Sequence, residues 1–154
     1  MKISGIAAVV TGGGSGIGAA TARHLASLGA KVTVLDVNQA NAEAVAKEID
    51  GLAQVCDVTD AGSVQSALAA ATAKHGTARL VVNCAGIATA SRILTRDGPH
   101  DLELFKRVIN INLIGSFNVL RLAADEMSKL DEMDEGERGC IVNTASASRR
   151  SWRT

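Results

Sequence analysis

A glycine-rich segment near the start of the chain has the residue types and spacing of a phosphate-binding loop. The segment TGGGSGIG spans residues 11–18, between the apolar run at 6–12 and an amphipathic stretch at 16–28. A buried strand is therefore predicted to pass through the loop into a helix. Backbone amides at such a helix start can bind a pyrophosphate, and glycine lets phosphates approach the backbone closely. The motif glycines, spaced GxxxGxG, are Gly12, Gly16 and Gly18.

An acidic residue ends the second predicted strand, KVTVLDV at residues 31–37. Asp36 follows Gly16 by about 20 residues, the separation at which a carboxylate binds the adenosine ribose. A carboxylate there accepts hydrogen bonds from both ribose hydroxyls and repels a 2′-phosphate. The neighbours Ser15 and Val37 provide no positive charge for such a phosphate. A solvated strand end is the alternative interpretation, but beside the glycine loop Asp36 predicts NAD rather than NADP.

The rest of the chain alternates between strand and helix patterns, and these elements must position the residues above. Further strands are predicted at 52–58, 79–86 and 139–145, and further helices at 40–50, about 60–75 and about 102–130. This alternation predicts an α/β fold with a doubly wound (Rossmann) parallel sheet of five strands, in the order 3-2-1-4-5. We expect the first two helices to cover one face of the sheet and the later two to cover the other.

The composition argues against some classes of binding partner and predicts the cellular compartment. The 154 residues carry 16 basic and 16 acidic side chains, so no charge excess favours nucleic acid or an anionic membrane as a partner. No apolar run is long enough to span a bilayer, and residues 1–20 contain glycines where a signal peptide needs an unbroken apolar stretch. The three widely spaced cysteines predict reduced thiols in a cytoplasmic protein. The three histidines are spaced for neither a metal site nor a catalytic triad.

Together with the glycine loop, four further stretches resemble the short-chain dehydrogenase/reductase family. They are CDVTD, NCAG, NINLIGSFNV and IVNTAS, and the resemblance covers residues 6 to about 148. It implies that Asp57 and Val58 hold the adenine ring and that the NCAG segment lines the cofactor. The cofactor-binding residues predicted for this chain are Gly12, Ser15, Gly16, Ile17, Gly18, Asp36, Asp57, Val58, Asn83, Cys84, Ala85 and Gly86.

The same resemblance assigns two catalytic positions. Asn112 has the place of the family's catalytic asparagine, which supports a water that relays protons to a lysine. Ser146 has the place of the serine that hydrogen-bonds the substrate carbonyl. Without the resemblance, Asn112 is equally consistent with an asparagine on an apolar helix stripe whose side chain hydrogen-bonds a neighbouring strand. Without the resemblance, Ser146 is equally consistent with an ordinary turn serine. Cys84 is interpreted as a small buried residue whose backbone contacts the cofactor, without thiol chemistry.

Within the family, the segments VNCAGIATAS, the stretch from residue 93 to 127 and IVNTAS resemble the short-chain type 2 3-hydroxyacyl-CoA dehydrogenases. The resemblance implies an NAD-dependent oxidation of a secondary alcohol, such as a 3-hydroxyacyl-CoA, to a ketone by hydride transfer. It implies a small-molecule substrate and no nucleic acid or membrane partner. Members of the family are homo-oligomers.

The family's proton acceptor is a tyrosine followed four residues later by a lysine, and this sequence contains no tyrosine. Residues 149–154, RRSWRT, form a divergent basic tail after an incomplete Rossmann domain at 1–148. We therefore expect a truncated or frameshifted chain that lacks the family's C-terminal strands and helices. Two functions stay open: an NAD-dependent oxidoreductase by family, and a catalytically inactive NAD-binding fragment or module.

Overall fold

A five-stranded parallel sheet forms the centre of the computed structural model, which describes residues 1–89, 92–96 and 98–145. The strand order is β3-β2-β1-β4-β7, which confirms the predicted order because β7 is the fifth strand of the sequence-based prediction. The strands are β1 (Ala7–Thr11), β2 (Lys31–Asp36), β3 (Leu52–Val55), β4 (Leu80–Asn83) and β7 (Cys140–Asn143). The chain runs outward from β1 to β3 and then returns to β4, so its direction reverses between β1 and β4.

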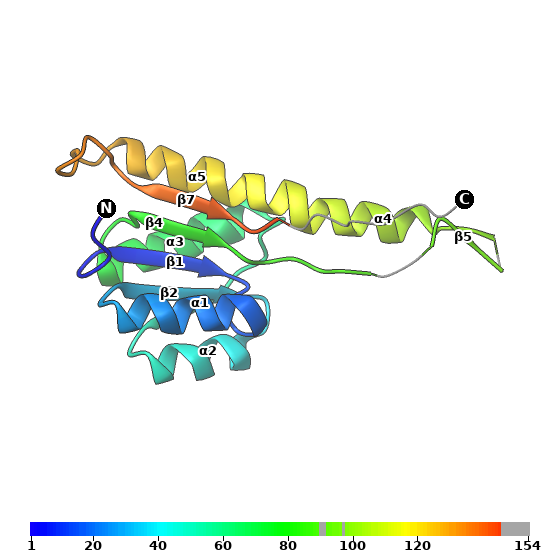
Figure 1. The fold of residues 1–154 in the computed structure, drawn as a ribbon, viewed down its shortest axis with the longest axis horizontal. Coiled ribbons are helices and arrows are strands. Elements are labelled where there is room, and N and C mark those ends of the chain that lie inside the picture. Colours follow the sequence, from blue (N-terminus) through cyan, green and yellow to red (C-terminus); the bar gives the residue numbers. More distant parts are fainter. Residues whose placement is uncertain (90–91, 97, 146–154) are drawn as a thin grey trace.

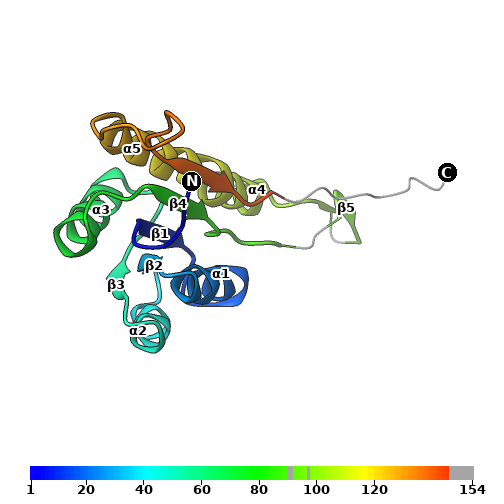
Figure 2. The same cartoon turned by 60° about the vertical axis from the view of Figure 1, so that its left-hand side comes forward.

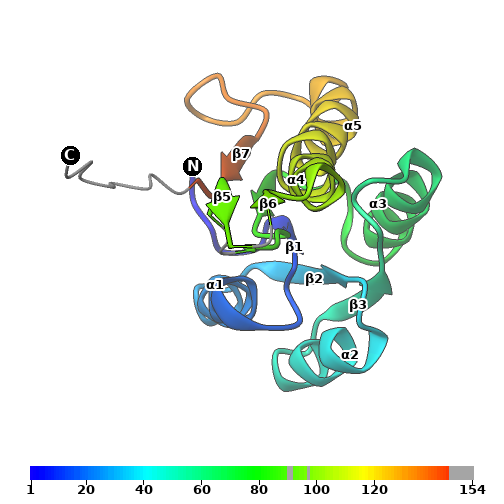
Figure 3. The same cartoon turned by 90° about the vertical axis from the view of Figure 1, so that its right-hand side faces the viewer.

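Helices cover both faces of the sheet, as expected from the alternating pattern (Figures 1 and 3). Polar side chains cap three of the helix starts, because Asn38, Asp60 and Asp101 each accept a hydrogen bond from a first-turn N–H. Among the described residues, no helix is long and apolar enough to cross a membrane. The α-helices are α1 (Gly16–Ser27), α2 (Gln39–Glu48), α3 (Ala61–His75), α4 (Leu102–Ile109) and α5 (Ser116–Ser128).

The core consists of two apolar layers separated by the sheet. Alternate residues of β1 point to opposite faces: Val10 packs with α1 and α2, whereas Val9 packs with α3 and α5. Both side chains are almost completely buried, at 0% and 1% exposure. A strand buried on both faces requires a continuous apolar run, which explains why AAVVT contains no charged residue.

The single helix predicted over residues 102–130 is interrupted by a π-helical segment, η1 (Asn110–Gly115), between α4 and α5. A β-hairpin of β5 (Leu94–Thr95) and β6 (Gly98–Pro99) precedes α4, between the strand predicted at 79–86 and the helix predicted from about residue 102. Both α4 and the hairpin project beyond the carboxyl ends of the sheet strands (Figures 1 and 2). Consequently α4 buries none of its residues, and the predicted apolar stripe does not continue onto the core there.

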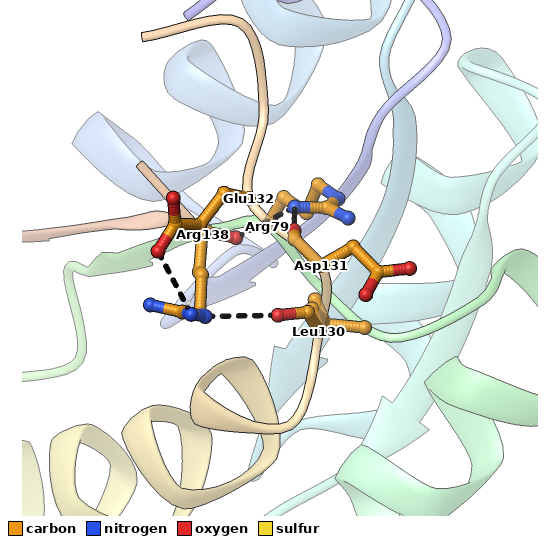
Figure 4. A network of polar contacts seen from close by, with 5 residues as sticks. All are labelled: Arg79, Leu130, Asp131, Glu132 and Arg138. Carbon is orange, nitrogen blue, oxygen red and sulfur yellow. Dashed lines mark hydrogen bonds and ion pairs between the residues drawn. The ribbon is translucent and has the colours of Figure 1, made fainter. Parts of the chain in front are cut away.

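A polar network anchors the segment that leads into β7 (Figure 4). Arg79, which precedes β4, donates from Nη1 to the carbonyl oxygens of Asp131 at 3.1 Å and Arg138 at 3.0 Å. Arg138 donates from Nε to the Leu130 carbonyl at 2.9 Å and pairs with Glu132, also at 2.9 Å. The network ties the end of α5 and the start of β7 to β4. At the same end of β7, the Cys140 N–H donates a backbone hydrogen bond to the Arg79 carbonyl at 2.8 Å.

β7 is an edge strand with one poorly covered face. Val142 pairs with Val82 of β4, so both side chains lie on the face of the sheet that carries α1. Val82 is 7% exposed, whereas Val142 is 45% exposed. In the described part of the chain, Val142 therefore gives this edge of the sheet an exposed apolar side chain.

Candidate functional site

A cavity of about 700 Å³ lies at the carboxyl ends of the sheet strands. It sits beside the reversal in strand order between β1 and β4, where open α/β sheets bind their ligands. Most of the cofactor-binding residues predicted from the sequence line this one cavity. They are Gly12, Ser15, Gly16, Ile17, Gly18, Asp36, Asp57, Val58, Cys84, Ala85 and Gly86.

The glycine loop packs too closely against its surroundings to carry side chains at several positions. Gly12 has a φ of +61°, and a Cβ there would lie 2.8 Å from the Ala85 Cα and backbone nitrogen. A Cβ at Gly18 would overlap the carbonyl oxygen of Gly12. Gly14, which is not one of the three spaced motif glycines, is restricted as well, because its Cβ would approach the Asp36 carboxylate to 2.8 Å.

The start of α1 faces the cavity with free hydrogen-bond donors. Ser15 is the N-cap residue, but its side chain makes no capping hydrogen bond. Among the described residues, the N–H groups of Gly16, Ile17 and Gly18 have no acceptor in the protein. Unpaired amides at a helix N-terminus, together with the helix dipole, form a site for a phosphate group.

The Asp36 carboxylate is held at the edge of the loop by two backbone donors. Its Oδ2 accepts a hydrogen bond from the Gly14 N–H at 2.9 Å, and its Oδ1 accepts one from the Asn38 N–H at 2.9 Å. Each carboxylate oxygen retains acceptor capacity for a further donor. A fixed carboxylate with free lone pairs is suited to accept hydrogen bonds from a pair of vicinal hydroxyls.

The segment after β3 presents a separate pair of polar groups. Asp57 uses Oδ1 to accept hydrogen bonds from the N–H and the hydroxyl of Thr59, at 2.9 and 2.8 Å. Within the part of the chain that the structure describes, neither Asp57 Oδ2 nor the Val58 N–H has a hydrogen-bond partner. A free acceptor beside a free donor matches the N6–H and N1 edge of adenine.

Asn83 does not line the cavity, in contrast to the other residues of the NCAG segment. Its side chain is 2% exposed and bonds three neighbouring elements. It donates to Asn143 Oδ1 at 2.8 Å and to the Ser116 carbonyl at 3.5 Å, and accepts from the Thr11 hydroxyl at 3.4 Å. Asn83 therefore connects the strand ends beneath the cavity. Its direct contact with a cofactor stays a prediction.

Asn112 lies in η1, and its amide is paired with the loop after β4. Its Oδ1 accepts from the Ile87 N–H and its Nδ2 donates to the Ile87 carbonyl, both at 2.9 Å. The partner of the Asn112 side chain is therefore the backbone of a loop. The alternative interpretation, an asparagine that hydrogen-bonds a neighbouring strand, required a strand as the partner. The Asn112 carbonyl accepts a hydrogen bond from the Ser116 hydroxyl at 2.8 Å. The other predicted catalytic residue, Ser146, lies outside the described residues.

The cysteine side chains near the cavity are poor nucleophiles at neutral pH. Burial raises the pKa of Cys84, and a hydrogen bond with Thr21 only partly opposes this effect. Burial also raises the pKa of Cys56, to about 11. Both thiols are therefore protonated at neutral pH, in agreement with an interpretation of Cys84 without thiol chemistry. The described residues contain no cluster of side chains that could hold a metal ion.

Part of the cavity wall was missed in the sequence-based prediction. Arg107, Asn110 and Ile111 come from α4 and η1, far from the loop in the sequence. Asn110 and Ile111 belong to the NINLIGSFNV stretch, but the resemblance assigned a role there to Asn112 alone. Val37, Thr59 and Ile87 directly follow predicted site residues, so sequence proximity could have identified them. The missed lining residues are Val37, Cys56, Thr59, Ile87, Arg107, Asn110 and Ile111.

The chain is similar in sequence to known dehydrogenases. The model of the short chain dehydrogenase family matches residues 6–151. Human 3-hydroxyacyl-CoA dehydrogenase type-2 is 45% identical over 149 residues, which cover 94% of this chain and 57% of the human protein. The Drosophila melanogaster protein of the same name is 46% identical, with 94% and 58% covered. The chain thus spans somewhat more than half the length of these relatives.

Solved structures show the same likeness. The crystal structure of 3-hydroxyacyl-CoA dehydrogenase type-2 from Mycobacterium avium matches with a TM-score of 0.83 and 37% identity, covering 92% of this chain and 56% of that one. A 3-ketoacyl-(acyl-carrier-protein) reductase from Brucella melitensis, complexed with NADH, also gives a TM-score of 0.83, with 32% identity and coverage of 94% and 58%. From its family match, its sequence relatives and its fold, the chain belongs to the short-chain dehydrogenase family.

Proposed function

We propose that this chain binds NAD in the cavity at the carboxyl ends of β1 to β4. The observation that carries the proposal is the joint placement of the free α1 amides and the anchored Asp36 carboxylate on one cavity wall. The amides suit the pyrophosphate, and the carboxylate suits the ribose hydroxyls. Asp57 and Val58 supply an acceptor and a donor for adenine.

The preference for NAD over NADP follows from charge. The Gly14 and Asn38 amides hold the Asp36 carboxylate where the ribose hydroxyls would bind, so a 2′-phosphate would bring a second negative charge beside it. Val37, which follows Asp36 in the cavity lining, is apolar and offers no compensating charge. We therefore expect NAD to bind at least tenfold more tightly than NADP, because one uncompensated charge contact near a protein surface costs more than 1.4 kcal/mol.

Titration calorimetry with NAD and NADP tests this assignment. Asp36→Ala should weaken NAD binding and reduce the preference for NAD over NADP. Asp134→Ala removes the same charge from the exposed loop before β7 and should leave both affinities unchanged. Equal or tighter binding of NADP by the unaltered chain would contradict the ribose assignment.

We further propose that the chain derives from an NAD-dependent oxidoreductase that converts a secondary alcohol, such as a 3-hydroxyacyl-CoA, to the ketone. The support is the identity to 3-hydroxyacyl-CoA dehydrogenases type-2 across nearly the whole chain. The nicotinamide of bound NAD supplies the hydride acceptor for such a reaction. In this proposal Ser146 hydrogen-bonds the substrate oxygen and Asn112 supports the proton relay, while its side chain holds the Ile87 loop.

A catalytically inactive NAD-binding module is the second candidate function. The 154 residues contain no tyrosine, so the family's usual proton acceptor is not among them. Loss of a general base reduces rates by about 10²–10⁴. We therefore expect the chain to produce no more NADH from 3-hydroxybutyryl-CoA than a Ser146→Ala variant does. NADH formation that depends on Ser146 would favour the oxidoreductase instead.

A further inference from the structure

Asn118 lies on α5, outside the cavity lining, yet it is bonded to a residue that lines it. Its side chain is 7% exposed, and its Nδ2 donates a hydrogen bond to the Val58 carbonyl at 2.9 Å. Its Oδ1 accepts two hydrogen bonds from the Arg121 guanidinium, from Nε at 3.2 Å and from Nη2 at 2.8 Å. The amide therefore links a cation on the surface of α5 to the segment after β3.

A second contact on the same side holds the Val58 side chain. A Cβ at Gly115 would lie 2.5 Å from Val58 Cγ2, so only a glycine lets Val58 pack this closely against η1. Val58 itself is 6% exposed. Gly115 and Asn118 are about one helical turn apart, so one turn of helix fixes both the side chain and the carbonyl group of Val58.

We infer that Asn118 is a positioning residue for the adenine subsite, acting through the backbone of Val58. The inference rests on the proposed binding of NAD. With the Val58 carbonyl bonded to Asn118, the Val58 N–H stays free beside Asp57 Oδ2 on the cavity wall. The Arg121 cation polarises the Asn118 amide and strengthens its hydrogen bond to the carbonyl.

If Asn118 has only a structural role, its side chain satisfies the buried Val58 carbonyl but does not affect which dinucleotide base the cavity binds. The two roles can be separated with a cofactor whose base has the opposite hydrogen-bond pattern. Adenine offers a donor at N6 and an acceptor at N1, which match Asp57 and the Val58 N–H. Hypoxanthine offers an acceptor at O6 and a donor at N1. The unaltered chain should therefore bind NAD more tightly than nicotinamide hypoxanthine dinucleotide.

The experiment measures both dissociation constants by calorimetry for the unaltered chain and for variants. Asn118→Asp keeps the size and the Arg121 partner but places an acceptor against the Val58 carbonyl. We expect it to weaken NAD binding about tenfold, the cost of losing one positioned hydrogen bond, and to bring the ratio of the two constants toward one. Arg121→Gln, at an exposed position, should lower the ratio to a smaller extent.

Ala123→Gly is the matched control, because Ala123 is buried on α5 in the same apolar core layer as Val58 and its methyl side chain cannot hydrogen-bond the Val58 carbonyl. It should lower stability and keep the unaltered ratio. If Asn118→Asp fails to fold, the Arg121→Gln ratio decides. A ratio unchanged in every folded variant overturns the inference alone. An unaltered chain that binds neither dinucleotide overturns the proposed function, and the inference with it.

Discussion

At the scale of single residues, the site depends on positions where no side chain fits. Gly12 adopts a φ of +61° and directly faces Ala85 of the loop after β4. We predict that Gly12→Ala lowers the free energy of unfolding by about 2 kcal/mol, from backbone strain and displacement of the β4 loop. The same displacement should abolish measurable NAD binding. Chemical denaturation and calorimetry give the two quantities.

Gly5→Ala provides the comparison for this variant. Gly5 also has a positive φ, +83°, but a Cβ there would meet nothing within 4 Å. Its cost should be the backbone strain alone, about 1 kcal/mol, with NAD binding intact. Equal effects of the two variants on NAD binding would mean that the close approach of Gly12 to Ala85 is unimportant.

At the scale of elements, the end of α3 carries a histidine that is unfavourable to protonate. Burial lowers the pKa of His75, and the charges of Lys74 and Lys31 lower it further. Its Nε2 is buried without a partner among the described residues. Because the folded pKa is below the unfolded value of about 6.5, the unfolded state binds a proton first as pH falls. The stability contributed by neutral His75 is therefore complete above pH 6.5 and decreases below it.

We predict that the unaltered chain is less stable at pH 5.5 than at pH 7.5, and that His75→Gln reduces this difference. Urea denaturation at the two pH values measures both free energies. His24→Gln, at an exposed position of α1, should retain the full pH dependence. If the stability of His75→Gln and of the unaltered chain depends on pH in the same way, groups other than His75 cause the loss of stability at low pH.

At the scale of the whole molecule, apolar side chains remain exposed along the helix that extends past the sheet. Leu102, Phe105, Leu113 and Phe117 of α4, η1 and α5 are 54–60% exposed, and Val142 of the edge strand β7 is 45% exposed. Exposed apolar surface of this kind drives association. We predict that the isolated chain self-associates and unfolds over a broad thermal transition, as measured by sedimentation and calorimetry.

A double substitution tests which surface is responsible for the self-association. Phe105→Glu combined with Phe117→Glu should shift the chain toward monomer. Val55→Glu changes an exposed apolar residue on β3, at the opposite edge of the sheet, and should leave association unchanged. A monomer with a sharp, cooperative melt would contradict this prediction and favour a self-sufficient binding module.

The sequence by itself determined the sheet and the central part of the site. Strands such as AAVVT are recognised by an unbroken apolar run, and helices by their spacing of apolar residues, because both signals are local. Gly12, Asp36 and Asp57 could be predicted for the same reason. Each lies at or just past the carboxyl end of a strand, and parallel strands bring those ends to one edge.

Only the tertiary structure decided which residues complete the site and how they are held. The pairing of Asn112 with Ile87, the burial of Asn83 and the hydrogen bond from Asn118 to Val58 involve partners distant in the sequence. Arg107 and Ile111 likewise reach the cavity from a helix that the sequence assigned to the core. Periodicity predicts which face of a helix is apolar, but contact with a particular strand end depends on how the elements pack together.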